Sequence, residues 1–225
     1  MFFPERIKSI KASDKVLEIG PGGTPFYRSD VLLEKIFDEE VAREQRGHAK
    51  SLNTEKELVF YEGGQFPFKN KEFDYVICSH VLEHIRSDEI EKFVAELERV
   101  ANKGYIEFPT IYYEYLYNFK VHTTFLNFKS NAIWYMGKNQ SRLDSFFSIQ
   151  KFFYKTLECG HDEIIRENKE YFFQGFEWEN EIVMIKTSDI EELCAEGVIS
   201  KNRKKTNFRQ SLKSKLQKIF KCGNY

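Results

Sequence analysis

Cysteine is scarce in this chain of 225 residues, and no spacing among its few cysteines matches a metal-binding motif or a disulfide framework. The four are Cys78, Cys159, Cys194 and Cys222. Hydrophobic runs of membrane-spanning length are missing, and the N-terminal stretch lacks the apolar core of a signal peptide. We therefore expect a protein of the reducing cytoplasm. Repeats and low-complexity linkers are missing as well, so the length suits one domain with additions or two small domains.

Net charge is also small, at −1, but it is distributed unevenly. Residues 201–221 hold nine lysines or arginines and no acid, which leaves 25 basic against 35 acidic residues elsewhere. The chain outside 201–221 is therefore acidic and would repel the phosphates of nucleic acid, so we expect no nucleic-acid partner. In the tail, apolar side chains recur at helical spacing: Phe208, Leu212, Leu216, Ile219 and Phe220. This basic amphipathic pattern suits peripheral association with an anionic membrane, at its inner face, or with an acidic protein; the alternative is a helix docked on the acidic body.

Apolar runs alternate with helical patterns in the first half of the chain. The runs predict strands over Lys15–Ile19, Val31–Leu33, Leu58–Tyr61, Asp74–Ser79 and Tyr105–Phe108. Ser87–Ala101 carries its apolar residues on one helical face, and Gly104 is expected to end that helix. This alternation predicts an α/β fold with a parallel sheet and right-handed crossovers.

Aromatic residues are concentrated in the second half. The pattern there predicts two hairpins, formed by Thr123–Phe128 with Ala132–Met136 and by Tyr171–Trp178 with Glu181–Lys186. It also predicts helices over Ser141–Leu157 and Ser188–Glu196. The aromatic side chains could stack on a substrate ring or could form the core of this part of the chain, and the sequence leaves both open.

A glycine-rich turn, Gly20-Pro-Gly-Gly23, directly follows the first predicted strand. Glycines at this point let the backbone turn tightly and approach a ligand closely. Pro25 occupies the third position of the dinucleotide fingerprint G-x-G-x-x-G, which argues against that version of the site. Glu34 and Glu62 end the second and third strands and should face the same crevice, where carboxylates can accept ribose hydroxyls and an exocyclic amine.

Four segments together resemble a class I S-adenosylmethionine-dependent methyltransferase of the group called methyltransferase type 11. They are Glu18–Gly23, Glu62–Phe68, Phe73–Ile85 and the helix that ends at Val100. The resemblance covers roughly residues 14–110. It implies a Rossmann-like, mostly parallel seven-stranded sheet with helices on both faces and an antiparallel last strand, and the late hairpin would supply strands six and seven. The link from Gly23 to the second strand is too short for a full-length first helix.

The resemblance also implies S-adenosylmethionine as cofactor and a set of contacts to it. Gly20 and Gly22 would line its methionine part with Glu18 close by, Glu34 would hold the ribose, and Glu62 with Gly63 would lie by the adenine. Ser79 and His80, at the end of the fourth strand, would line the side that faces the transferred methyl group.

Methyl transfer to a hydroxyl would need a base, and two histidines are candidates. His80 is the first and His122 the second, although either could be a structural residue held by hydrogen bonds. A rival interpretation is a zinc hydrolase, because His80-Val-Leu-Glu83-His84 matches the motif H-x-x-E-H. A third is a catalytically silent domain that binds a partner through its basic tail. The favoured interpretation, a methyltransferase, includes no metal.

The expected organisation is a methyltransferase domain over residues 1–200 and a basic tail over 201–225. An insertion over 109–157 would cover the acceptor side of the crevice. The expected acceptor is a small molecule or a glycan intermediate, methylated at oxygen.

Overall fold

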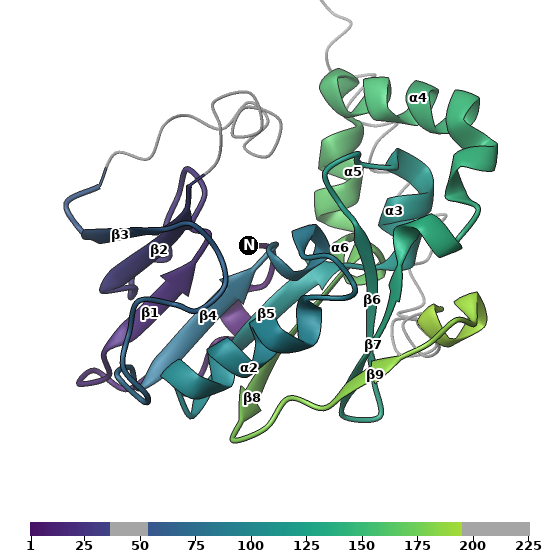
Figure 1. The fold of residues 1–225 in the computed structure, drawn as a ribbon. Coiled ribbons are helices and arrows are strands. Elements are labelled where there is room, and N and C mark those ends of the chain that lie inside the picture. The colour runs from purple at the N-terminus through teal and green to yellow at the C-terminus, as the bar shows by residue number, and fades with distance from the viewer. Residues whose placement is uncertain (37–53, 195–225) are drawn as a thin grey trace, which may run out of the picture. The chain divides into compact units, whose positions relative to one another are not determined.

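A computed structural model describes residues 1–36 and 54–194 of the chain (Figure 1). The tail over 201–225, with its predicted amphipathic helix, lies outside these residues. No helix within the described ranges is long and apolar enough to cross a membrane.

The main sheet follows directly from the apolar runs of the first half. Its strands are β1 (Val16–Ile19), β2 (Val31–Lys35), β3 (Glu57–Tyr61), β4 (Tyr75–Ser79), β5 (Lys103–Pro109) and β8 (Phe173–Glu179). They lie in the order β3-β2-β1-β4-β5-β8, with the first five parallel and β8 antiparallel to β5. The predicted α/β fold with a mostly parallel sheet and an antiparallel last strand is confirmed. Seven strands were expected, whereas the described part of this sheet has six.

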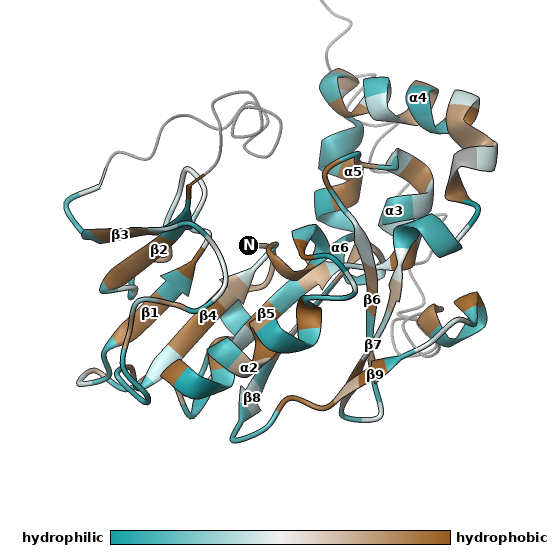
Figure 2. Ribbon diagram, viewed as in Figure 1, coloured by the Kyte–Doolittle hydropathy of each residue, from teal (hydrophilic) through white to brown (hydrophobic). Residues whose placement is uncertain are grey.

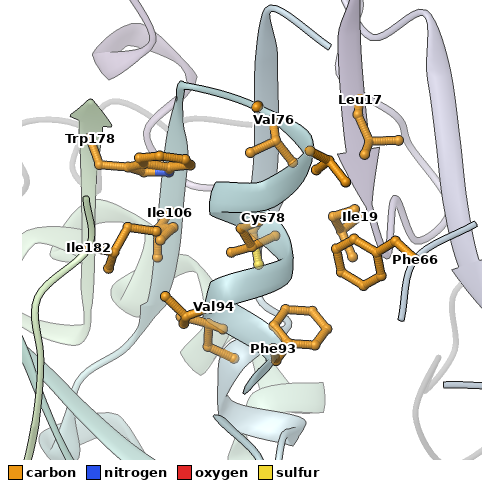
Figure 3. Close-up of a cluster of buried hydrophobic side chains, with 14 of the residues drawn as sticks. Leu17, Ile19, Phe66, Val76, Cys78, Phe93, Val94, Ile106, Trp178 and Ile182 are labelled. Atoms are coloured by element: carbon orange, nitrogen blue, oxygen red, sulfur yellow. The ribbon is translucent and has the colours of Figure 1, made fainter. Parts of the chain in front are cut away.

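Helix α2 (Ile90–Val100) packs its apolar side on one face of this sheet. The core between them is completely buried at most positions, and Figure 3 shows Leu17, Val76 and Cys78 of the strands facing Phe93 and Val94 of the helix. Figure 2 shows the outer side of α2 to be mainly hydrophilic, as expected for a helix with one buried side. The prediction that Gly104 ends this helix is wrong. The helix ends at Val100, and Gly104 lies inside β5, where a Cβ would come within 2.3 Å of the carbonyl oxygen of Val76.

The opposite face of the sheet is covered by the N-terminal segment, which contains the 3-10 helix η1 (Pro4–Arg6). Ile7 and Ile10 of this segment pack on a buried cluster formed by Val16, Tyr75, Ile77 and Tyr105. Helices were expected on both faces. The connection between β1 and β2 contains no helix, because residues 20–30 are too few to cross the sheet as a helix and return.

A second, three-stranded sheet has the order β6-β7-β9, from β6 (Thr124–Lys129), β7 (Ala132–Gly137) and β9 (Met184–Lys186). β6 and β7 form the predicted hairpin, and both turn residues, Ser130 and Asn131, have positive φ as a tight hairpin requires. The second predicted hairpin is wrong. β8 pairs with β5 in the main sheet, whereas β9 crosses to pair in parallel with β7. The turn at Asn180 is present, but it redirects the chain between two sheets.

The segment between β5 and β8 runs from residue 110 to residue 172 and contains β6, β7 and a group of helices. These are α3 (Ile111–Tyr117), η3 (Lys138–Gln140), η4 (Leu143–Phe146), α4 (Phe147–Thr156), η5 (Leu157–Cys159), α5 (His161–Glu167) and α6 (Lys169–Phe172). In Figure 1 α3 to α6 gather beyond one end of β5. After β9, the 3-10 helix η6 (Ile190–Leu193) lies within the predicted helix at 188–196, and Asp189 caps it by accepting a hydrogen bond from the Glu191 amide.

Candidate functional site

The predicted cofactor residues lie in a row along the carboxyl end of the main sheet. Gly20 follows β1, Glu34 is the penultimate residue of β2, Glu62 follows β3 and Ser79 ends β4. Because these four strands are parallel and adjacent in the order β3-β2-β1-β4, all four positions share one edge. The topology therefore brings these predicted positions together.

The predicted glycine turn lies directly after β1. Gly20 and Gly22 have φ values of 58° and 59°, which side chains rarely tolerate. The Gly20 amide donates a 2.9 Å hydrogen bond to the Leu33 carbonyl, which fixes the turn to β2. A Cβ at Gly20 would lie 2.8 Å from Cγ2 of Val81, whereas one at Gly22 would meet no described atom within 4 Å. Gly20 is therefore a packing position, and Gly22 leaves room for a ligand.

Glu18 holds the rest of this loop in place. Its side chain is buried, and its Oε2 accepts hydrogen bonds from the Phe26 amide at 2.8 Å and the Ser29 hydroxyl at 2.7 Å. Burial raises the pKa of Glu18, and the hydrogen bond from Ser29 acts in the opposite direction. Glu18 thus fixes Phe26 and Ser29 in the connection between β1 and β2.

The positions predicted to contact ribose and adenine are more exposed. Glu34 is half-buried at the end of β2, and Glu62 is exposed just beyond β3. Gly63 has a φ of 118°, and a Cβ there would lie 3.4 Å from Cε of Lys35. The chain thus turns back across the end of β2 directly after Glu62.

His80 is held between two carboxylates at the end of β4. Its Nδ1 lies 3.2 Å from Oε1 of Glu83 and its Nε2 lies 2.9 Å from Oε1 of Glu107. Burial would lower the pKa of His80, but the hydrogen bonds to Glu107 and Glu83 and their charges raise it to about 9. At neutral pH the ring is therefore a cation that binds its two carboxylates, which does not favour the predicted role as a base.

Glu107 is a central residue of the site that the sequence analysis missed. It is completely buried in β5 and accepts hydrogen bonds from the Tyr105 hydroxyl at 2.6 Å and the Phe3 amide at 3.0 Å. Ser79, predicted to lie beside the methyl group, contacts it at 3.3 Å. A lone acid in an otherwise apolar strand, Tyr105-Ile-Glu-Phe108, was the signal that could have revealed it.

His122 lies just before β6, as predicted, and is buried. Its Nδ1 is 2.5 Å from Oε1 of Glu114, a buried carboxylate on α3 that the sequence analysis also missed. The ring stacks on Phe119 and presents its edge to His84, with ring centroids 5.1 Å and 4.7 Å away.

The helical H-x-x-E-H arrangement of the zinc-hydrolase interpretation is wrong. His80 has a φ of 58° and precedes a short 3-10 helix, η2 (Leu82–His84), so His80 and His84 do not share the face of an α-helix. His84 is instead directed to the segment before β6, where its Nδ1 lies 3.2 Å from the Val121 carbonyl. Burial lowers the pKa of His84, an effect that the Glu83 charge opposes.

Comparison with protein families gives one match, and it falls on this part of the chain. Residues 17–106, from β1 to β5, match the family model of the methyltransferase domain. The predicted resemblance to class I S-adenosylmethionine-dependent methyltransferases is therefore confirmed for this segment. No curated protein matches the chain.

Several solved structures are similar to the chain over part of its length. A protein from Pyrococcus horikoshii is 26% identical, with a TM-score of 0.34, over 44% of this chain and 47% of that one. A SAM-dependent methyltransferase from Archaeoglobus fulgidus is 17% identical, with a TM-score of 0.41, over 53% and 57%. A putative methyltransferase from Bacillus halodurans is 22% identical, with a TM-score of 0.32, over 47% and 49%. The chain thus spans about half the length of these relatives.

Proposed function

We propose that this protein is an S-adenosylmethionine-dependent methyltransferase that acts on oxygen of a small molecule or a glycan intermediate. The observation that carries the proposal is the glycine turn after β1, with Gly22 facing open space, inside the segment that matches the methyltransferase family.

The residues present fit such a cofactor. Gly22, with its left-handed backbone and no described atom within 4 Å of a Cβ there, leaves space beside the end of β1, which suits the close approach of a ligand. Glu34, one strand away, supplies a carboxylate of the kind that binds ribose hydroxyls. When bound, S-adenosylmethionine would supply a methyl group on a sulfonium, which needs no activation by the protein.

The contribution of this chain would then be to hold two reactants in line and to exclude water. Ser79 and His80 end β4 next to the glycine turn, and the network through Glu107 fixes both side chains. The segment 110–172 follows β5 directly, and in this proposal it would cover the acceptor. An oxygen acceptor must also lose a proton, and the ionisable groups Glu83, His84 and His122 gather beyond β4, where such a proton can be received.

Calorimetry with S-adenosylhomocysteine would test the cofactor site. We expect micromolar binding by the wild type, loss of binding in Gly22→Arg, and a loss of at least about tenfold in Glu34→Ala, from one or two charge-assisted hydrogen bonds. Glu167→Ala, an exposed acid on α5, is the matched control and should bind normally. Unchanged binding in both site variants would refute the assignment of the site.

Transfer of a labelled methyl group from S-adenosylmethionine to components of a cell extract would test the activity. The labelled product from a small-molecule or glycan fraction is then identified by mass spectrometry and NMR: a methyl group bonded to oxygen supports the proposed acceptor, and one bonded to nitrogen, sulfur or carbon refutes it. Binding of the cofactor with no labelled product would favour the alternative, a silent domain that binds a partner.

We also propose that the basic tail at 201–221 associates with an anionic membrane surface, since its charge and its apolar spacing suit one. Liposome flotation of the full chain against a chain that ends at Ser200 is the test, and equal flotation would refute the proposal.

A further inference from the structure

Three potential metal ligands meet beyond the end of β4. Glu83 and His84 come from η2, and His122 comes from the segment that leads into β6. One ligand atom from each of the three lies within 4.8 Å of the others. Two imidazoles and one carboxylate form a ligand set typical of zinc and related divalent ions.

The two histidines are oriented as metal ligands usually are. Nδ1 of His84 lies 3.2 Å from the Val121 carbonyl, and Nδ1 of His122 lies 2.5 Å from Oε1 of Glu114. Since a carbonyl and a carboxylate only accept hydrogen bonds, each Nδ1 is the donor, and in the neutral ring that binds metals the lone pair is on Nε2. A histidine that donates one nitrogen to an oxygen and keeps the other for a metal is the common arrangement in metal sites.

The buried carboxylate of Glu83 also indicates a ligand. Its side chain is 1% exposed, and its Oε1 contacts His80. Its Oε2 finds no hydrogen-bond partner among the described residues. A buried carboxylate oxygen without a partner is costly, at about 1–3 kcal/mol or more for a charged group, so such an oxygen calls for a ligand.

The backbone of the cluster is held in place before any ion binds. The Thr123 amide donates a 2.7 Å hydrogen bond to the Glu83 carbonyl, and the Thr123 hydroxyl lies 3.3 Å from the carbonyl of His84. These bonds join η2 to the segment that carries His122, although the two are far apart in the sequence. Preorganisation of this kind lowers the cost of assembling a site.

We propose that Glu83, His84 and His122 bind a divalent transition-metal ion, the carboxylate through Oε2 and each imidazole through Nε2. Ligand atoms around a tetrahedral zinc ion are about 3.3 Å apart, so these side chains must draw together by rotation of their torsions. Three protein ligands leave at least one coordination position open, as in catalytic zinc sites. This ligand set differs from the H-x-x-E-H motif in the sequence, because it omits His80 and includes His122. Binding of the ion does not depend on the proposed methyl transfer.

Metal binding by the full-length protein without an affinity tag would test the proposal. The protein is stripped with a chelator, loaded with Zn²⁺ or Co²⁺, passed over a desalting column and analysed for metal. We expect one equivalent of ion and a visible Co²⁺ absorption band. Because Cys78, Cys159 and Cys194 are free thiols, the near-ultraviolet region is also recorded, where Co²⁺–thiolate bonds absorb strongly and nitrogen and oxygen ligands do not.

His84→Asn, His122→Asn and Glu83→Gln should each weaken Zn²⁺ binding by at least about tenfold, as loss of even an outer partner of a metal ligand does. His161→Gln is the matched control, because His161 contacts Tyr117 and Thr156 and belongs to no such cluster among the residues that the structure describes. Circular dichroism and urea denaturation show that each variant is folded, whether or not the protein binds the proposed cofactor. A wild type that retains no ion, a thiolate band, or equal affinity in the control and the three variants would overturn the proposal.

Discussion

Alanine substitutions at Gly20 and Gly22 should separate the structural role of the glycine turn from its role in binding. Both residues have nearly the same backbone conformation, with φ values of 58° and 59°. Their surroundings differ, because a Cβ at Gly20 would contact Val81 and a Cβ at Gly22 would meet no described atom within 4 Å. The two variants therefore carry the same backbone cost and differ in what the added methyl group meets.

The magnitudes follow from two effects. Alanine in the left-handed region costs about 1–2 kcal/mol, which applies to both variants. At Gly20 the methyl group would also lie 2.8 Å from Cγ2 of Val81, a β-branched side chain that cannot rotate away easily. Overpacking of this kind adds about 1–3 kcal/mol. We expect Gly20→Ala to lower the free energy of unfolding by about 2–5 kcal/mol in total, and Gly22→Ala by about 1–2 kcal/mol.

Binding should show the reverse order. A methyl group at Gly22 would project into the space proposed for the cofactor, so Gly22→Ala should weaken S-adenosylhomocysteine more strongly than Gly20→Ala does, once both are compared under conditions where they are folded. Urea denaturation gives the stabilities and calorimetry gives the affinities. Equal stabilities would refute the packing argument at Gly20, and wild-type affinity in Gly22→Ala would refute the placement of the cofactor beside it.

Three further perturbations test other contacts. Gly104→Ala should lower the free energy of unfolding in urea by about 3 kcal/mol, because its Cβ would lie 2.3 Å from the Val76 carbonyl oxygen; wild-type stability would contradict this. Burial would raise the pKa of Glu107, but the hydrogen bond from His80 and its charge lower it from 4.5 to about 2. Glu107→Gln should therefore lower the free energy of unfolding at pH 7 by on the order of 3 kcal/mol. A lowered carboxyl pKa contributes stability above pH 4.5 that is lost as the pH falls towards 2. The stabilities of wild type and Glu107→Gln should therefore converge near pH 2, and a difference that stays constant with pH would contradict this role of the Glu107 charge. Tyr135→Phe should cost about 1 kcal/mol by removing the hydrogen bond to Glu91, and an unchanged Tm would show that this bond contributes nothing.

Short sequence patterns were enough to predict the strands of the first half and the turn of one hairpin. The strands of the first half are close to their predicted bounds, and the turn at 129–131 joins β6 and β7 as expected. Apolar runs and turn residues act over a few positions, so they can be found without knowing the fold. The same holds for the tight turn predicted after β1, where Gly20 and Gly22 have positive φ.

The partners of β9 and the buried acids could not be found in this way. A turn at Asn180 predicts a change of direction, but the sequence does not say that β9 leaves β8 and pairs with β7. Glu107 and Glu114 are acids in aromatic surroundings, and only the fold shows that each is buried against a histidine. His122 was identified as a candidate base but not as a neighbour of Glu83 and His84, because that proximity depends on the path of α3 and the segment after it.

One strained turn connects the glycine loop with the Glu83–His84–His122 cluster. His80 has a φ of 58°, a conformation that costs a residue with a side chain about 1–2 kcal/mol. Its amide donates a 2.8 Å hydrogen bond to the Glu107 carbonyl, and its ring bridges Glu107 and Glu83, contacts that offset this cost. Directly after this residue, Val81 lies against Gly20, and Glu83 lies beside His84 and His122. Backbone strain that surrounding contacts maintain is typical of functional sites. Here it lies at the start of residues 80–83, which contact the proposed cofactor loop through Val81 and the proposed ion through Glu83.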